Sequence, residues 1–277
     1  MQVVRTRADL RAALAGAPRP IGLVPTMGWL HAGHVSLVDR ARAESATVVM
    51  SIFVNPRQFG EARDFEQYPR NEARDLAMAE ASGVDVVFAP AVDEVYLPGF
   101  DTVVSVGAIA RPLEGAARPG HFDGVATVVA ILFALVGAER AYFGLKDYQQ
   151  VAVIRRMALD LALPTRVVPC ETVREPDGLA LSSRNARLSS EGRTRAAVLH
   201  RALAAGAECI RAGERSADAV RAVVHRVLGE EPTASVDYVS VADPDTLAEL
   251  TDVEGPALLS LAVRVEGVRL IDNELVG

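Results

Sequence analysis

Short apolar runs alternate with helical patterns between residues 20 and 169, and this alternation restricts the fold more than any other feature of the sequence. A bounded apolar run of about four to eight residues is typical of a buried strand. Strands that alternate with helices imply right-handed βαβ units and a parallel sheet. We therefore predict an α/β fold on a doubly wound parallel sheet, with strands at 20–26, 47–54, 84–88, 103–106, 141–143 and 165–169 and helices at about 33–45, 70–82, 125–136 and 147–161.

The pattern changes after about residue 176. Two stretches rich in Ala and Arg look helical, and three apolar runs follow them. The expected elements are helices at 188–213 and 215–228 and strands at 236–241, 257–265 and 268–271. Helices followed by strands indicate a smaller α+β domain with its own core. The turn-rich segment REPDG at 174–178 marks the change, so we predict domains at 1–176 and 177–277.

Composition excludes several classes of protein. The 277 residues are 50% apolar and 23% charged, as in ordinary globular proteins. The net charge of −7 argues against a nucleic-acid partner, because general nucleic-acid binders need a basic face. Cys170 and Cys209 form neither a disulfide framework nor a metal spacing. The apolar stretch 125–138 is too short to cross a bilayer, and residues 1–20 lack a secretory signal. We expect a cytoplasmic protein with no membrane partner.

Nearly all of the basic residues in the sequence are arginine rather than lysine. Of the 29, 28 are arginine, and the single lysine is Lys146. Codon bias across a genome explains an excess of arginine, but it does not explain why one lysine is kept at position 146. Lysine is a compact point charge on a flexible stem, whereas arginine is a planar fork. A site shaped for a point charge beside a phosphate would accept lysine alone, so Lys146 is a candidate site residue.

The segment PTMGWLHAGH at 25–34 directly follows the first predicted strand and enters a helix. His31 and His34 are three residues apart and share a face near the helix start, where free N–H groups and positive potential suit a phosphate. Gly28 and Gly33 let the backbone approach a ligand closely. The alternatives are a pair of capping or core histidines, or a zinc site, for which no cysteine or third histidine lies nearby in the sequence.

Two common nucleotide-binding motifs are missing. The sequence contains neither G-x-x-x-x-G-K-[ST] nor G-x-G-x-x-G. If the chain binds a nucleotide, neither a P-loop nor a dinucleotide fingerprint holds it. The H-x-G-H pattern after the first strand is the remaining known solution.

Two loops at the expected ligand edge have open interpretations. Gln58, in FVNPRQF after the second strand, could orient a carboxylate without neutralising it, or it could be a solvated loop residue. The segment LEGAARPGHFDG at 113–124 contains three glycines and a proline, and Arg118 and His121 add positive charge. This loop could be a closing flap or a plain surface loop.

Two further segments add polar side chains. In GLKDYQQ at 144–150, the lone lysine falls at the carboxyl end of a predicted strand, where ligands bind in doubly wound sheets. Asp147 could instead cap the next helix, and Gln150 lies one turn into that helix. In LSSRN at 181–185, two hydroxyl groups and a guanidinium suit a phosphate.

Together these segments resemble the pantothenate synthetase (pantoate–β-alanine ligase) family of the H-x-G-H nucleotidyltransferase superfamily. The resemblance runs nearly end to end, through PTMGWLHAGH, FVNPRQF, YPRNEARD, LEGAARPGHFDG, YFGLKDYQQ, DGLALSSRN and LIDNELV. It implies a Rossmann-like N-terminal catalytic domain that binds ATP and pantoate, and a smaller C-terminal lid domain. It also implies a homodimer that requires ATP and Mg²⁺.

The resemblance implies roles for individual residues. The implied ATP-binding residues are Met27, Gly28, Trp29, Leu30, His31, Ala32, Gly33, His34, Gly144, Leu145, Lys146, Asp147, Val173, Leu181, Ser182, Ser183 and Arg184. His34 matches the family's proton donor. Gln58 and Gln150 match the glutamines that hold pantoate, Gln58 also lies near β-alanine, and His121 is a further substrate-binding candidate. Asp75 falls where relatives place a magnesium-associated acid; some relatives have a second acid beside it, but this chain has Arg74.

The implied reaction has two steps. The carboxylate of pantoate attacks the α-phosphate of ATP to give pantoyl adenylate and pyrophosphate, and the amine of β-alanine then displaces AMP. His31, His34, Lys146 and Arg184 are donors or cations that can meet the charge formed in the first step. Excluding water from the adenylate is the expected role of the loop at 113–124 and of the C-terminal domain.

Two other classes of function stay open. A different H-x-G-H enzyme, such as a mononucleotide adenylyltransferase or an amino-acid-activating relative, should lack the pair Gln58 and Gln150. A non-catalytic nucleotide-binding or scaffold protein should have lost His34 or Lys146. Neither residue is lost.

Replacing Lys146 with arginine tests the importance of a point charge. We expect Lys146→Arg to lower turnover although the charge is kept, because a planar fork does not fit a place shaped for an ammonium group. Steady-state kinetics measure the effect. Turnover close to that of the unmodified protein would show that the point-charge argument is wrong.

Overall fold

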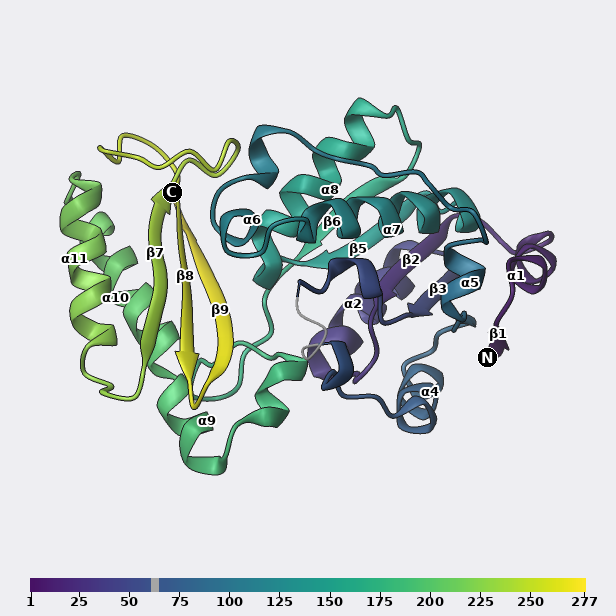
Figure 1. The fold of residues 1–277 in the computed structure, drawn as a ribbon, viewed down its shortest axis with the longest axis horizontal. Coiled ribbons are helices and arrows are strands. Elements are labelled where there is room, and N and C mark those ends of the chain that lie inside the picture. Colours follow the sequence, from purple (N-terminus) through teal and green to yellow (C-terminus); the bar gives the residue numbers. More distant parts are fainter. Residues whose placement is uncertain (61–64) are drawn as a thin grey trace. The chain divides into compact units, whose positions relative to one another are not determined.

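The computed structural model describes residues 1–60 and 65–277 (Figure 1). Its contacts divide the chain into two compact units. The N-terminal unit comprises Met1–Leu145 and Gln149–Glu171, and the C-terminal unit comprises Lys146–Tyr148 and Thr172–Gly277. The main break follows Glu171, a few residues before the boundary that the sequence predicts after residue 176. Each unit has its own hydrophobic core.

Six parallel strands form the sheet of the N-terminal unit, in the order β1–β4–β3–β2–β5–β6. They are β1 Gln2–Val4, β2 Ile21–Thr26, β3 Thr47–Ile52, β4 Val86–Phe88, β5 Arg140–Gly144 and β6 Arg166–Cys170. The chain leads outward from β2 through β3 on one side and from β5 to β6 on the other. The carboxyl ends of β2 and β5 therefore flank the switch point at which ligands bind in such sheets. The predicted doubly wound α/β fold is confirmed.

Helices cover both faces of this sheet (Figure 1). The helical segments of this part of the chain are α1 Arg7–Leu14, α2 Ala32–Glu44, η1 Pro56–Gln58, α4 Glu72–Ala81, α5 Val92–Val95, η2 Ala108–Ala110, α6 Glu114–Ala117, α7 His121–Val136, η3 Leu145–Asp147 and α8 Tyr148–Asp160. In β3, Val49 packs in a core with α1, α7 and α8, whereas Val48 and Met50 pack in a second core with α2 and α4. Because both faces of the central strands β2 and β3 are buried, these strands are mainly apolar, and the sequence shows them clearly.

Some expectations for this unit are wrong. Residues 103–106 do not form a strand; the N–H of Val104 donates to Thr127 Oγ1 at 2.9 Å, so it does not pair with a neighbouring strand. The helix expected from residue 125 begins at His121, inside the glycine-rich loop. The sequence does not predict β1 and α1, because a strand of three residues and a helix of eight give little periodicity.

The C-terminal unit combines an antiparallel sheet with helices. Its elements are η4 Ser183–Arg187, α9 Ser190–Ala196, α10 Val198–Arg211, α11 Ala217–Leu228, β7 Ser235–Ala242, β8 Ala257–Val265 and β9 Val268–Val276. Helices α10 and α11 pack against each other and against the sheet (Figure 1), so the expected α+β architecture is confirmed. The helix predicted at 188–213 is divided into α9 and α10 at Ala197. Strand β9 continues past residue 271 to Val276.

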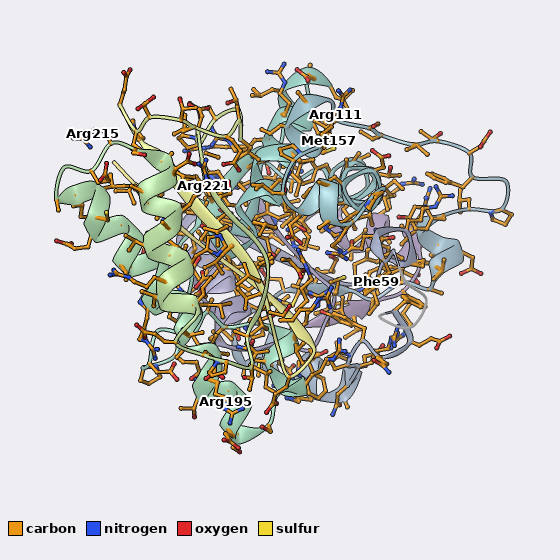
Figure 2. The ribbon with its side chains drawn as sticks, turned by 60° about the vertical axis from the view of Figure 1, so that its left-hand side comes forward. Phe59, Arg111, Met157, Arg195, Arg215 and Arg221 are labelled. Atoms are coloured by element: carbon orange, nitrogen blue, oxygen red, sulfur yellow. The ribbon has the colours of Figure 1, made fainter. Side chains whose placement is uncertain are left out.

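In each unit, apolar side chains are buried in the core and most charged side chains lie at the surface. Met157 is buried in the core of the N-terminal unit, whereas Arg215 projects into solvent from the C-terminal unit (Figure 2). Arg221 of α11 instead folds back and donates to the carbonyl groups of Val241 and Leu250, at 3.1 and 2.8 Å. Among the described residues, every helix is either too short or too polar to cross a membrane.

Gly206 permits the close packing of α10 in the C-terminal core. A Cβ atom there would lie 2.7 Å from both Leu259 Cδ2 and Val224 Cγ2. Overpacking typically costs about 1–3 kcal/mol, and the higher helix propensity of alanine returns about 1 kcal/mol. We expect Gly206→Ala to lower the free energy of unfolding by about 1 kcal/mol, measured by urea denaturation. Gly16→Ala is the control, since a Cβ atom added there would have nothing within 4 Å. Equal stability of the two variants would contradict this packing argument.

Candidate active site

A buried carboxylate holds the loop between β2 and α2. Gly28 and Trp29 both have positive φ, +83° and 52°, which glycine adopts easily and tryptophan rarely. Asp75 of α4 is 2% exposed and accepts the backbone N–H groups of Trp29 and Leu30 at 2.7 and 2.8 Å. Such charge-assisted bonds are roughly twice as strong as neutral ones and offset the strain at Trp29. A Cβ on Gly28 would lie 2.9 Å from Asp75 Oδ2, so the loop requires glycine there.

Arg74 also binds this loop. Its guanidinium carbon lies 5.1 Å from the centre of the Trp29 ring, within the range of a cation–π interaction. Its Nη2 donates to the carbonyl oxygen of Leu30 at 2.8 Å. Position 74 therefore carries a cation that supports the backbone of the loop.

The side chains near Asp75 do not form a metal cage. Magnesium prefers about six oxygen ligands in octahedral geometry and usually keeps several waters. Both oxygens of Asp75 already accept N–H groups. The part of the chain that the structure describes contains no group of three or more His, Cys, Asp or Glu side chains able to hold a metal. The donors thus do not fit a magnesium ion held by the protein alone, and the zinc alternative for His31 and His34 lacks further ligands there.

His31 and His34 cap the start of α2 reciprocally. His31 Nδ1 accepts the N–H of Gly33 at 3.2 Å, and His34 Nδ1 accepts the N–H of His31 at 3.2 Å. The capping interpretation is confirmed, but it does not exclude chemistry. A ring nitrogen that accepts an N–H carries no proton, so each neutral ring has its proton on Nε2. With ring centroids 4.1 Å apart, the pair places two Nε2 donors beside the helix N-terminus.

Gln58 lies beside the same loop and is not a solvated residue. It ends η1, which follows β3, and it is 8% exposed. Its Nε2 contacts Met27 Sδ at 2.8 Å, so the residues that follow β3 and β2 meet. The surface-loop interpretation of Gln58 is therefore wrong, and its carboxamide belongs to the same cluster as the loop at the end of β2.

The glycine-rich segment 113–124 packs against η1. His121 is 9% exposed and donates from Nδ1 to the carbonyl oxygen of Gln58 at 2.8 Å, and Arg118 Nη2 donates to the same oxygen at 3.1 Å. A Cβ on Gly124 would lie 2.2 Å from a backbone oxygen of η1, so only glycine fits. The plain surface-loop interpretation is wrong for His121 and Gly124, which are buried. The closing-flap interpretation stays a prediction.

Asn55 connects these elements, although no sequence motif marks it as a site residue. Its Nδ2 donates to Gln58 Oε1 at 3.1 Å and to the carbonyl of Gly124 at 3.0 Å. Its Oδ1 accepts the hydroxyl of Tyr96 at 2.7 Å, and burial raises the pKa of Tyr96 to about 12, so this phenol stays a donor. An Asn directly before Pro56 is typical of a helix N-cap, which was the available signal.

Two adjacent glutamines in α8 have different surroundings. Gln149 is 5% exposed; its Oε1 accepts the N–H of Glu114, and its Nε2 donates to the carbonyl groups of Ile109 and Pro112. It therefore holds the segment before α6, a role that the sequence did not reveal. The amide of Gln150 makes no hydrogen bond within the described residues.

The remaining candidates are in the C-terminal unit, apart from Gly144, which ends β5, and Leu145, which follows it. The N–H of Leu181 donates to the carbonyl of Val173 at 2.9 Å, and Ser182 caps η4 by accepting the N–H of Arg184 at 3.2 Å. Lys146 Nζ lies 3.6 Å from Asp147 Oδ1. Val173 and the 181–184 segment thus come together. Whether the candidates of the two units form one site stays a prediction.

The model of the pantoate–β-alanine ligase family matches residues 2–275 of the chain. The chain belongs to this family. Two curated relatives, both named pantothenate synthetase, cover nearly all of it. The relative from Roseiflexus sp. (strain RS-1) is 60% identical over 99% of this chain and 98% of its own length. The relative from Chloroflexus aggregans (strain MD-66 / DSM 9485) is 57% identical over the full length of both chains.

Solved structures agree with this membership. A pantothenate synthetase from Thermus thermophilus matches with a TM-score of 0.95 and 50% identity, over 99% of both chains. The pantoate–β-alanine ligase from Francisella tularensis matches with a TM-score of 0.82 and 32% identity, over 99% of this chain and 97% of that one. The Francisella enzyme is in complex with β,γ-ATP and β-alanine. The chain is therefore a ligase of this family, as its sequence motifs indicate.

Two substitutions separate the capping and chemical roles of His34. Asparagine keeps an acceptor near the place of Nδ1 but has no donor at Nε2, whereas glutamine places an amide near Nε2 and loses the cap. We expect His34→Asn to lower turnover by about 10²-fold, the usual loss for a donor at developing charge. We expect His34→Gln to keep more turnover and to lose about 1 kcal/mol of stability. Steady-state kinetics and thermal melts measure both, and normal turnover in His34→Asn would refute the chemical role.

Proposed function

We propose that this ligase joins pantoate to β-alanine through a pantoyl-adenylate intermediate. In the first step, a carboxylate oxygen of pantoate bonds to the α-phosphorus of ATP and pyrophosphate leaves. In the second step, the amine of β-alanine bonds to the acyl carbon, AMP leaves, and the amine loses a proton. The observation that carries the proposal is the reciprocal capping of His31 and His34 at the sheet edge where this family's H-x-G-H motif begins α2.

The start of α2 suits the charge that forms in the first step. Attack on the α-phosphorus increases negative charge on its non-bridging oxygens and on the leaving pyrophosphate. The N-terminus of the 13-residue α2 carries partial positive charge. The Nε2–H groups of His31 and His34 are donors held by the backbone bonds at Nδ1, so they need little reorganisation when the charge appears. We assign the proton-donor role to His34.

Two carboxamides suit the nucleophile. We propose that Gln58 and Gln150 hold pantoate, and that Gln58 also lies near β-alanine. A neutral amide orients the pantoate carboxylate without quenching its nucleophilicity, as a guanidinium would. Gln58 is supported on its backbone by Arg118 and His121 and on its side chain by Asn55. Its position is thus fixed before substrate arrives, which lowers the entropic cost of alignment.

Other features of the function remain proposals. Lys146 and Arg184 would supply positive charge to the phosphates of ATP, Val173 and residues 181–183 would line the nucleotide, and Mg²⁺ would enter with ATP as part of the substrate. The roles of 1–176 as a catalytic domain and of 177–277 as a lid, and the homodimer, are carried over from the family resemblance, whereas the domain boundary and the cytoplasmic location rest on the sequence pattern and composition. The β-alanine and β,γ-ATP bound by the Francisella enzyme support the choice of substrates.

Pantoate-dependent exchange of labelled pyrophosphate into ATP tests the proposal. With Mg²⁺ present and β-alanine absent, we expect exchange with pantoate and none when amino acids replace it, because only pantoate forms the adenylate. If exchange is absent, pyrophosphate release could require β-alanine, so formation of pantothenate and AMP is measured next with all substrates. Failure of both assays would refute the proposed reaction. Exchange with an amino acid would support the amino-acid-activating alternative.

A further inference from the structure

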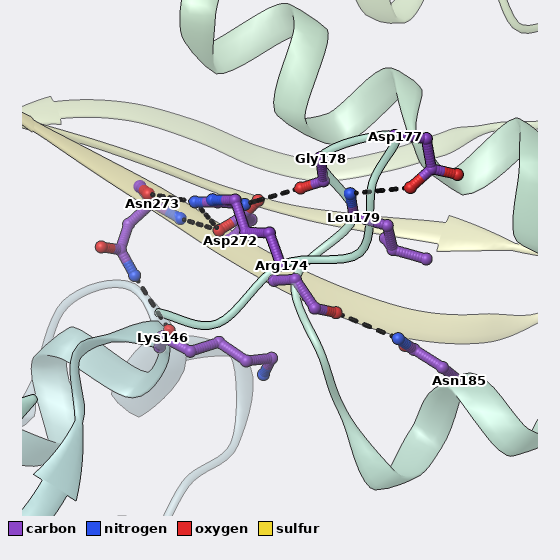
Figure 3. Close-up of polar contacts among 9 residues, drawn as sticks. Lys146, Arg174, Asp177, Gly178, Leu179, Asn185, Asp272 and Asn273 are labelled. Carbon is purple, nitrogen blue, oxygen red and sulfur yellow. Dashed lines mark hydrogen bonds and ion pairs between the residues drawn. The ribbon is translucent and has the colours of Figure 1, made fainter. Parts of the chain in front are cut away.

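A buried ion pair lies where the last strand meets the loop that follows β6 (Figure 3). Asp272 of β9 is 3% exposed, and both of its oxygens bind Arg174, at 2.6 and 3.0 Å. The same guanidinium donates to the carbonyl of Gly178 at 3.0 Å and to that of Asn273 at 3.4 Å. A bidentate pair with further bonds has a fixed geometry, so it can serve as an anchor for neighbouring segments.

One side of this anchor reaches the lone lysine. Asn273 follows Asp272 in β9, and its backbone N–H donates to Asp272 Oδ1 at 2.9 Å. Its side-chain Nδ2 donates to the backbone carbonyl of Lys146 at 2.9 Å (Figure 3). A second bond holds the same turn, because the Tyr148 hydroxyl donates to the carbonyl of Pro244 at 3.2 Å. The backbone of Lys146 is thus held by hydrogen bonds to β9 and to Pro244, in addition to the bonds within its own turn.

The other side of the anchor reaches the candidate phosphate-binding segment. Arg174 forms an isolated antiparallel bridge with Ala180, which brings the chain into position for residues 181–184. The carbonyl of Ala180 accepts the side-chain N–H of Asn185 at 3.0 Å, at the end of that segment. Lys146 and Arg184, the two cationic candidates in this unit, therefore extend from backbone segments that are both linked to the ion pair of Arg174 and Asp272.

We propose that Asn273 is a positioning residue for adenylate formation, and that it acts by fixing the backbone of Lys146. The inference rests on the proposed function, in which the ammonium group of Lys146 meets the phosphates of ATP. Lysine has a long flexible stem, so the place of its backbone decides which positions the ammonium can reach. A displacement of about 1 Å at a reacting centre lowers the rate by about 10²-fold, so one lost bond at this point has a measurable effect.

Two substitutions remove the bond in different ways. Asn273→Ala deletes the donor, and Asn273→Asp keeps the shape but sets a carboxylate against the Lys146 carbonyl. Glu274→Ala is the matched control, because Glu274 is the next residue of β9 and forms an ion pair with Arg211, at 3.4 Å. We expect both Asn273 variants to lower kcat for pyrophosphate exchange by about tenfold or more, with the control unchanged. Melting temperatures are measured in parallel, and kinetics are recorded well below the lowest of them.

A double-mutant cycle shows whether Asn273 acts through Lys146. Asn273→Ala is introduced with Lys146 present and with Lys146→Ala, and slow exchange is followed with radiolabelled pyrophosphate. If the proposal is right, the loss of about tenfold shrinks to less than about twofold once Lys146 is gone, because residues that act as a unit are not additive. Equal losses in both backgrounds would mean that Asn273 acts independently of Lys146, and would overturn the proposal.

The remaining outcomes separate this proposal from the proposed function. If the unmodified chain is active and the Asn273 variants match Glu274→Ala, only the positioning role is overturned. A purely structural role predicts a lower melting temperature, with normal kcat for the molecules still folded, and this result also overturns it. If the unmodified chain shows neither exchange nor full turnover, the proposed function fails and the positioning role fails with it.

Discussion

The candidate residues at the start of α2 depend on one interaction, the hydrogen bonding of the Asp75 carboxylate to the loop before that helix. Its two bonds to the N–H groups of Trp29 and Leu30 hold the chain in a conformation that those residues do not favour alone. That conformation decides where α2 begins, and therefore where the imidazoles of His31 and His34 lie. Asp75, which the family resemblance associates with a metal, thus supports the loop between β2 and α2 in this structure.

The cluster around Gln58 is built in the same way. Neighbouring side chains bind both the backbone carbonyl and the side-chain amide of Gln58. This residue, which we expect to meet substrate, therefore has little conformational freedom. Asn55 binds the Gln58 amide, while His121 and Arg118 bind its carbonyl. Sites whose supporting groups are themselves fixed hold their geometry closely. The glycine at 124 is part of this support, because a side chain there would meet the backbone of η1.

The sequence predicts most of the fold because the central strands are buried on both faces. Strands β2 and β3 appear as uninterrupted apolar runs, and His31 and Gln58 could be placed at their ends. The prediction is wrong at residues 103–106, where a valine-rich run gives its N–H at Val104 to a threonine of α7 instead of a strand. It stops too early in β9, because Asp272 and Asn273 interrupt the apolar pattern. Asp272 has its partner 98 positions away along the chain and Asn273 has its partner 127 positions away, and no local pattern reveals such pairs.

The rarity of lysine has a practical consequence for spectroscopy. Because Lys146 is the only lysine among the 277 residues, isotope-labelled lysine would give a single side-chain signal. The ammonium group lies beside the Asp147 carboxylate and its side chain is 16% exposed, so that signal would respond to charge placed near it. The protein therefore carries its own one-residue probe, at a position fixed by the strand that contains Asn273.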